Sequence, residues 1–335
     1  TGRSKTLRHQ DPHSRNPKDL TLPQILQYNA SVYGVKKTAI RDKAYGIWQT
    51  YTWEDYYRFV NLSAAGLAAL GMKRGENLAL IVNNSPEWLF CELAAHALGA
   101  TSLNLFTSSI AEELSFSIGR IASPVVVVQD QEQVDKLLEV RDKLPHTVKV
   151  VYIDPTGMTF YDENDWLISY ARLLELGQDY LAEHPDDVDR KIAKGRPDDM
   201  AIMIQTSGTT GVPKLAMLSH RNLTTMARQW IEAENLKPEE NWISMSPPAW
   251  IVDQMWGMGV SLVSAMTMNF PETAETVPED FREIGPSILI TASRFWEDMA
   301  SRIRVKISDA GWLKRHLFDM AEQFGRSLEI GRAHV

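Results

Sequence analysis

Short apolar segments alternate with helix-length amphipathic segments along much of the chain. The apolar segments, expected as buried strands, are 78–82, 101–105, 125–128 and 148–153. The helices expected between them are 85–98, 109–118 and 131–144, with Gly119 ending the second. Because parallel strands need a long crossover, usually a helix, this alternation predicts βαβ units. We therefore expect an α/β fold, two-lobed, with mostly parallel sheets flanked by helices.

Capping residues mark the helices that come first in the chain. Thr21 is expected to cap a helix with Pro23 in its first turn and Gly34 at its end. A capping box at Thr52–Asp55 opens a helix that runs to Leu70. Between these helices, residues 38–41 and 47–51 are expected to form a strand pair.

The alternation stops after residue 153 and restarts at Met200. Later strands are expected at 201–205, 215–218, 242–246, 265–270 and 287–291, and helices from Ser219 and over 250–264, 278–284 and 294–308.

The predicted organisation is a disordered arm (1–19), a first lobe (20–153), a connecting excursion (154–199), an incomplete second lobe (200–328) and a tail (329–335). The tail resembles the translation of a sequencing-adapter read-through, so we expect the natural chain to continue differently after about Leu328.

The composition of the chain argues against several classes of function. The chain has 335 residues, 44% of them hydrophobic, and a net charge of −8 without a basic stripe, so nucleic acid is not an expected partner. Its one cysteine, Cys91, lies in an apolar helical run, and no Cys or His pairs have metal-ligand spacing. The longest uncharged window, 254–270, is too short for a membrane span. We expect a cytoplasmic protein, with peripheral contact with a membrane left open.

One stretch organises the candidate chemistry. The nine residues 206–214 read Thr-Ser-Gly-Thr-Thr-Gly-Val-Pro-Lys, and apolar segments flank them on both sides. Glycines let backbone N–H groups approach a ligand, four hydroxyls add donors, and Lys214 adds a positive charge that suits phosphate. The stretch therefore predicts a phosphate-binding loop. A simple hairpin turn is the plain alternative, and the Pro-Lys ending counts against it.

Other nucleotide-binding motifs do not fit. In a Walker A motif Gly-Lys is followed by Ser or Thr, whereas Pro213 precedes Lys214 and Leu215 follows it. The chain contains no Gly-x-Gly-x-x-Gly, and no Gly-x-Ser-x-Gly elbow that would indicate a catalytic triad. His220 follows the loop at a helix start, where a structural role is the simpler interpretation.

Residues 206–214 resemble the signature of the adenylate-forming superfamily, which includes acyl-CoA synthetases, with Leu215 where glycine is usual. The resemblance implies that the loop holds the β- and γ-phosphates of ATP while a carboxylate attacks the α-phosphate. It implies Lys214 and Thr209 as catalytic residues and Thr210 as the contact to Mg²⁺. The phosphate contacts it implies are Thr206, Ser207, Gly208, Thr209, Thr210, Gly211 and Lys214.

A second stretch, 245–256, follows an expected strand and opens a helix. Its tryptophans and methionine would line an apolar channel or belong to the core, and the residues alone leave both open. Related enzymes carry a Pro-rich turn and an aromatic or His residue here, beside the acyl substrate. The resemblance thus implies Trp250, with Gln254 and Trp256 near it, as substrate residues.

Within the superfamily the chain resembles long-chain fatty-acid–CoA ligases over residues 20 to about 328. Supporting stretches are 45–53, 84–88, 129–136, 270–273, 278–281 and 293–297. The family's later motifs and its C-terminal lid domain with a catalytic lysine do not occur in this sequence. The segment therefore corresponds to part of the large N-terminal domain.

The implied reaction uses ATP, Mg²⁺ and CoA to convert a fatty acid to acyl-adenylate and then to a thioester. One alternative is a ligase that loads a carrier protein instead of CoA. Another is that these 335 residues alone form a non-catalytic segment that binds nucleotide or fatty acid. Acyl chain length and oligomeric state are not predicted.

Overall fold

The structure is a computed structural model that describes residues 20–161, 163–206, 214–291 and 293–329. The expected arm 1–19, the loop residues 207–213 and the tail from residue 330 onward lie outside the described residues. The chain divides into two units, one ending at Ile288 and one beginning at Leu289.

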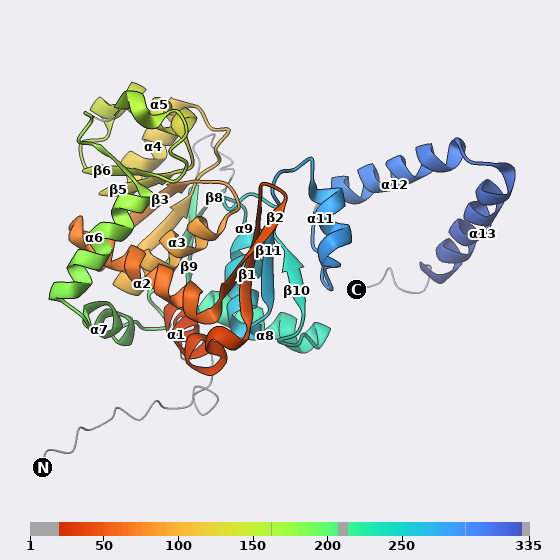
Figure 1. Ribbon diagram of the computed structural model, residues 1–335, viewed down its shortest axis with the longest axis horizontal. Coiled ribbons are helices and arrows are strands. Elements are labelled where there is room, and N and C mark those ends of the chain that lie inside the picture. Colours follow the sequence, from red (N-terminus) through yellow and green to blue (C-terminus); the bar gives the residue numbers. More distant parts are fainter. Residues whose placement is uncertain (1–19, 162, 207–213, 292, 330–335) are drawn as a thin grey trace, which may run out of the picture. The chain divides into compact units, whose positions relative to one another are not determined.

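A seven-stranded sheet forms most of the first unit (Figure 1). Its strands, in spatial order, are β7 (Leu167–Ser169), β6 (Lys149–Tyr152), β5 (Val125–Val128), β3 (Asn77–Ile81), β4 (Thr101–Asn104), β8 (Met200–Thr206) and β9 (Lys214–Ser219). Neighbouring strands are parallel except β8 and β9, which form an antiparallel hairpin at the edge. The expected α/β class with mostly parallel sheets flanked by helices is confirmed.

A second sheet joins the beginning of the described chain to its later part. Its strands, in spatial order, are β10 (Asn241–Ile243), β11 (Thr267–Phe270), β1 (Thr38–Ala44) and β2 (Ile47–Thr52). β1 pairs in parallel with β11 and antiparallel with β2. Both sheets therefore contain strands from either side of residues 154–199, whose place as a connection between two lobes stays a prediction.

Helices cover both faces of the seven-stranded sheet. The α-helices described up to residue 234 are α1 (Leu22–Tyr33), α2 (Trp53–Ala69), α3 (Pro86–Leu98), α4 (Ala111–Ile121), α5 (Gln131–Glu139), α6 (Tyr170–Glu183), α7 (Asp187–Ala193) and α8 (His220–Glu234). α4 and α5 bury Leu114, Ile118 and Leu137 against one face, together with Ala79 and Val126 from the strands. α2, α3 and α6 lie over the other face (Figure 1).

The predicted capping signals operate as expected. The Thr52 side chain accepts a hydrogen bond from the Asp55 N–H at 3.1 Å, and the Asp55 carboxylate accepts one from the Thr52 N–H at 3.1 Å. Gly99 ends α3 in the left-handed conformation, with φ 77°. These local contacts satisfy backbone groups that a helix end would leave unpaired.

Several expectations about element ends are wrong: the helix expected over 131–144 ends as α5 at Glu139, and the strand expected over 242–246 ends as β10 at Ile243. α4 does not end at Gly119 but continues to Ile121, because Ile118 and Ile121 both pack into the core. The expected strand 287–291 is reduced to one bridge between Trp242 and Ile288. The Ser287 hydroxyl accepts the Asn241 N–H at 2.9 Å and so occupies a donor that a ladder would use.

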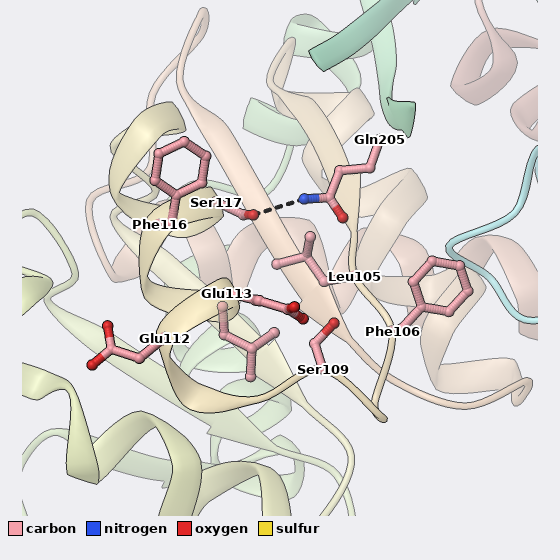
Figure 2. A pocket seen from close by; sticks show the side chains of 9 residues that line it. Leu105, Phe106, Ser109, Glu112, Glu113, Phe116, Ser117 and Gln205 are labelled. Carbon is pink, nitrogen blue, oxygen red and sulfur yellow. Dashed lines mark hydrogen bonds between the residues drawn. The ribbon is translucent and has the colours of Figure 1, made fainter. Parts of the chain in front are cut away.

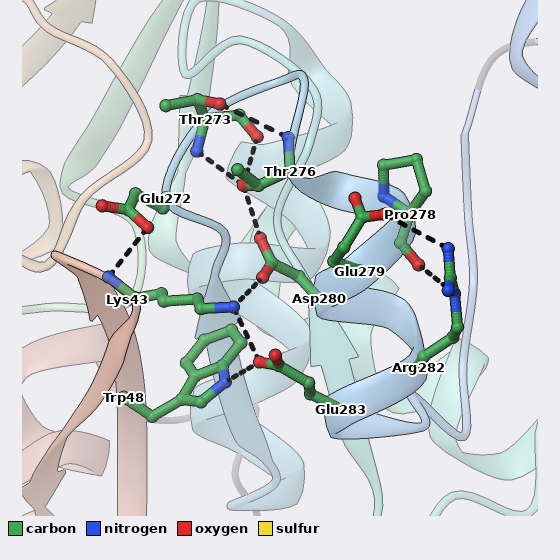
Figure 3. Close-up of polar contacts among 11 residues, drawn as sticks. Lys43, Trp48, Glu272, Thr273, Thr276, Pro278, Glu279, Asp280, Arg282 and Glu283 are labelled. Atoms are coloured by element: carbon green, nitrogen blue, oxygen red, sulfur yellow. Dashed lines mark hydrogen bonds and ion pairs between the residues drawn. The ribbon is translucent and has the colours of Figure 1, made fainter.

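An ion pair ties β1 to α11 (Val277–Ile284), as Figure 3 shows. The buried ammonium of Lys43 lies 2.7 Å from Asp280 and 2.7 Å from Glu283, and the indole N–H of Trp48 donates to Glu283 at 2.8 Å. The hydroxyl of Thr276 donates to Asp280 at 2.8 Å. Each buried charge therefore has an opposite charge and hydrogen bonds, as burial requires.

The second unit contains α12 (Ser293–Ser308) and α13 (Trp312–Glu329). The Glu322 carboxylate accepts from Arg304 at 2.7 Å and from Arg326 at 2.9 Å, which joins the two helices. α12 confirms the predicted helix 294–308, whereas α13 was not predicted. Among the described residues, no helix is both long and apolar enough to cross a bilayer.

α2 and α6 cross at a pair of glycines. A Cβ added to Gly66 would lie 2.3 Å from the Leu173 carbonyl oxygen, and one added to Gly177 would lie 2.1 Å from the Leu62 carbonyl oxygen. Both obstacles are backbone atoms, so relief would require the helices to separate. The crossing therefore depends on two residues without side chains.

We expect Gly177→Ala to lower the free energy of unfolding by about 2 kcal/mol or more, because overpacking against backbone forces the helices apart. The matched control is Gly119→Ala in α4, where the nearest atom to an added Cβ is 3.9 Å away. Gly119→Ala should raise the free energy of unfolding by up to about 1 kcal/mol, because alanine has a higher helix propensity than glycine. Urea denaturation measures the free energy of unfolding of both variants. Equal changes in the two would contradict the close approach of α2 and α6 at Gly66 and Gly177.

Candidate functional site

The base of the predicted phosphate loop is the end of the β8–β9 hairpin. Thr206 pairs with Lys214 across the two strands, and the Thr206 hydroxyl donates to the Lys214 carbonyl at 3.3 Å. Both residues are exposed. The other expected phosphate contacts, Ser207–Gly211, and with them the expected roles of Thr209 and Thr210, lie outside the described residues.

The hairpin projects from the carboxyl edge of the parallel strands. β8 runs parallel to β4, so Thr206 leaves the sheet at the same edge as Asn104 and Leu105. Ligands of open α/β sheets bind outside this edge. The strand direction thus brings the predicted loop to the edge at which a ligand site is expected.

A cavity of about 480 Å³ opens beside the hairpin (Figure 2). It is lined by Leu105, Phe106, Ser109, Glu112, Glu113, Leu114, Phe116, Ser117 and Gln205. The Gln205 amide, one residue before the loop, donates to the Ser117 hydroxyl on α4 at 2.8 Å. The Glu112 carboxylate is paired with Lys143. The cavity therefore combines two phenyl rings with polar groups directly next to the start of the loop.

A second cavity, of about 150 Å³, lies at the same edge and shares Leu105 and Phe106 with the first. Its remaining lining comes from the end of β3, from Thr107 and Ser108, and from the turn after β10, and consists of Val82, Asn83, Asn84, Thr107, Ser108, Met245, Pro247, Pro248 and Ala249. The two stretches singled out in the sequence therefore border neighbouring cavities. This agrees with a ligand that extends from the loop toward the turn.

The three expected substrate residues lie in different environments. Trp250, at the end of the turn, is 46% exposed. Trp256 is buried beside Trp230 and Trp242, with ring centroids 5.4 Å and 6.5 Å away. Gln254 is fully buried and opens a π-helix, Gln254–Val260. Trp250 is the one of the three with a solvent-accessible ring.

Gln254 belongs to a buried cluster around the carboxylate of Glu92 on α3. Oε1 of Glu92 accepts from Ser102 at 2.5 Å and from Asn104 at 2.8 Å. Oε2 accepts from the Trp88 indole at 2.5 Å and from Gln254 at 3.2 Å. Burial raises the pKa of Glu92, and these four hydrogen bonds act in the opposite direction.

A second buried carboxylate, Asp253, ends the short helix α9 (Ile251–Asp253) directly after the turn. Its Oδ1 accepts from the Ser244 hydroxyl at 2.5 Å and from the Asn84 amide at 3.1 Å. Burial raises the pKa of Asp253 to about 7, with the hydrogen bond from Ser244 opposing the shift. The Asp253 and Glu92 clusters together form a polar layer behind the Pro-rich turn.

His220 is structural, as its position at a helix start indicated. Ser219 caps α8 with Asn222 in a capping box, and the His220 Nδ1 accepts the Leu22 N–H at 3.4 Å. The His96 ring stands edge-on to it, with centroids 5.2 Å apart. Burial, and secondarily the charge of Arg74, lowers the pKa of His220 to about 3.

A family model described as AMP-binding enzyme matches residues 26–329. The chain belongs to the AMP-binding enzyme family. A long-chain-fatty-acid–CoA ligase of Xenopus laevis, ACSBG2, is 26% identical over 328 residues, which cover 95% of this chain and 43% of the relative. The ligase ACSBG1 of Rattus norvegicus is 28% identical over 297 residues, which cover 86% of this chain and 39% of the relative. The resemblance inferred from the sequence is confirmed, and the chain spans less than half the length of these relatives.

Solved AMP-binding enzymes share the fold. The anthranilate–CoA ligase AuaEII, in complex with anthranoyl-AMP, superimposes with a TM-score of 0.67 at 19% identity, over 82% of this chain and 50% of that one. The A-PCP didomain of a carboxylic acid reductase from Segniliparus rugosus, in complex with AMP, gives a TM-score of 0.68 at 21% identity, over 89% of this chain and 46% of that one. At these identities the comparison establishes the architecture.

Asn84, Glu92 and Asp253 were not among the residues singled out by the sequence analysis. A lone acid inside the apolar run 88–98 was a signal for a buried, hydrogen-bonded carboxylate, and Asp253 stands directly before Gln254. Asn84 was noted only as part of a resembling stretch. Their partners are far away in the sequence, so no local pattern identifies them.

The low pKa of His220 predicts a pH-dependent contribution to stability. The folded protein keeps the imidazole neutral while the unfolded chain binds a proton below about pH 6.5, so stability falls as pH decreases from there toward about 3. In His220→Asn, whose amide oxygen can replace Nδ1, this slope should decrease by up to about 1.4 kcal/mol per pH unit. Urea denaturation between pH 4 and 6.5 measures both slopes. Identical slopes would contradict a neutral buried His220.

Proposed function

We propose that the protein containing this chain activates a fatty carboxylate with ATP to an acyl-adenylate and then transfers the acyl group to CoA. The single observation that carries the proposal is that the loop base, Thr206 and Lys214, stands at the carboxyl edge of the sheet in a chain of the AMP-binding family. The names of the relatives, long-chain-fatty-acid–CoA ligases, support the choice of substrate class.

The proposed first step is an in-line displacement at the α-phosphate. The carboxylate oxygen forms a bond to phosphorus while the bond to the pyrophosphate oxygen breaks, and acyl-adenylate and pyrophosphate result. Negative charge increases on the departing pyrophosphate, so donors fixed around it stabilise the transition state. The proposed donors are Lys214, the hydroxyl of Thr206 and the amides and hydroxyls of 207–211.

Magnesium would neutralise phosphate charge when bound with ATP. Among the described residues, no group of three His, Cys, Asp or Glu side chains could hold a metal ion. Proteins commonly bind Mg²⁺ through one or two side chains together with substrate phosphates and water. The contribution proposed for this chain is the hydroxyl of Thr210.

The proposed acyl side is the turn after β10. Trp250 presents an exposed ring next to the cavity formed by Pro247, Pro248 and Ala249. The proline and alanine side of this cavity suits the methylene groups of a fatty carboxylate, while Asn84 and Thr107 on its other side are polar. The thioester would then form when the CoA thiolate attacks the acyl carbonyl and AMP leaves.

The test is carboxylate-dependent exchange of pyrophosphate into ATP by the complete protein that the gene encodes. Lys214→Ala should lower the exchange rate by about 100-fold or more, because one transition-state donor with a full charge is lost. Lys214→Arg should retain part of the rate. An exposed lysine at the end of α7, Lys194, gives the matched control Lys194→Ala, which should leave exchange unchanged.

Unchanged exchange in Lys214→Ala would contradict the role of the loop. Exchange without any acyl-CoA product when CoA is added would favour a carrier protein as acceptor. The two steps are therefore separated by assaying exchange and thioester formation on the same preparation.

A further inference from the structure

The turn after β10 is held by side chains as well as by its own backbone. Pro247 and Pro248 have no backbone N–H, so the turn lacks two of the donors that would normally close it. Three of its carbonyl groups accept hydrogen bonds, and two of the three donors are side-chain amides, one from Asn84 and one from Gln254 on the helical segment directly after the turn. An ordinary turn is closed by backbone groups alone, whereas here two side-chain donors are added to one backbone bond.

Three successive carbonyl oxygens accept one hydrogen bond each. The Asn84 amide donates to the Ser246 carbonyl at 2.7 Å, and the Gln254 amide donates to the Pro248 carbonyl at 2.9 Å. Between them, the Trp250 N–H donates to the Pro247 carbonyl at 2.8 Å. The turn is therefore held from two sides by amides whose positions are fixed elsewhere.

Both amides are fixed by buried carboxylates. The Gln254 nitrogen also donates to Glu92 at 3.2 Å, so both of its N–H groups are used and the amide cannot rotate without losing a bond. The Asn84 nitrogen also lies 3.1 Å from Asp253 and 2.6 Å from the Ser244 hydroxyl. Glu92, Asp253 and Gln254 have no exposed surface, so water cannot replace these bonds without opening the core.

We propose that Asn84 and Gln254 are positioning residues that fix the backbone of Ser246–Trp250 and thereby set the acyl-side wall of the 150 Å³ cavity. This inference rests on the proposed function for its consequence in catalysis. Gln254, which the sequence suggested as a substrate contact, acts through the turn and does not touch the substrate. Its amide determines where Pro248 and the ring of Trp250 stand relative to the end of β4.

Gln254→Met tests the inference, because methionine keeps the length of the side chain and removes both donors. Hydrogen–deuterium exchange of the Trp250 amide should accelerate about tenfold relative to the parent, as expected for one lost hydrogen bond of about 1.4 kcal/mol. Asn84→Leu removes the donor to the Ser246 carbonyl and should accelerate exchange of the Trp250 amide to a similar extent. This readout does not require activity.

The matched control is Asn29→Leu. Asn29 is also a buried amide, and it donates to the Leu262 carbonyl at 2.8 Å, away from the turn. It should lower thermal stability by an amount similar to Gln254→Met and leave exchange of the Trp250 amide unchanged. If all three variants accelerate that amide equally, the effect is general destabilisation and the inference is wrong.

In the complete protein, Gln254→Met should raise the KM for the fatty carboxylate by about tenfold to 100-fold in pyrophosphate exchange and leave the KM for ATP unchanged. A faster Trp250 amide with an unchanged carboxylate KM would overturn the assignment of the turn to the acyl side. A parent protein without any carboxylate-dependent exchange would instead contradict the proposed function, and the Trp250 amide would still decide the role of Gln254.

Discussion

Parallel pairing of β4 with β8 determines where the candidate chemistry stands. Because the two strands run in the same direction, the segments that follow them leave the sheet at one edge. One segment begins the stretch proposed to bind phosphate at Thr206, and the other begins at Leu105, which lines both cavities. An antiparallel β8 would have carried the loop to the opposite edge. The place of the loop base, Thr206 and Lys214, is thus a consequence of strand direction.

The sequence was most informative where structure is local. Capping residues such as Thr52 and Ser219 and the left-handed Gly99 determine helix ends through neighbours three or four residues away, so composition and spacing suffice. The family could be recognised because the glycines and hydroxyls of residues 206–214 are contiguous in the sequence. The α/β class followed from the alternation of strands and helices for the same reason.

Features that depend on distant partners could not be predicted. The bond between Gln254 and Glu92 joins residues 162 apart, and the Gly66–Gly177 crossing depends on how two helices approach each other. The failed strand at 287–291 has a similar origin, because a Ser287 hydroxyl took the donor that pairing would have used. In each case the outcome depends on the three-dimensional position of one polar group, which residue type alone does not reveal.

The central place of β1 in the second sheet affects how the protein is made. Arg41, near the start of the described chain, contacts Asn269 on β11 across 228 residues of sequence. A ribosome that adds about 5 to 20 residues per second needs roughly 10 to 45 s to synthesise that interval. Throughout this time the nascent β1–β2 hairpin has one edge without its partner strand. Such an edge can pair with other chains, so the amino-terminal segment is where shielding by a chaperone during translation would matter most.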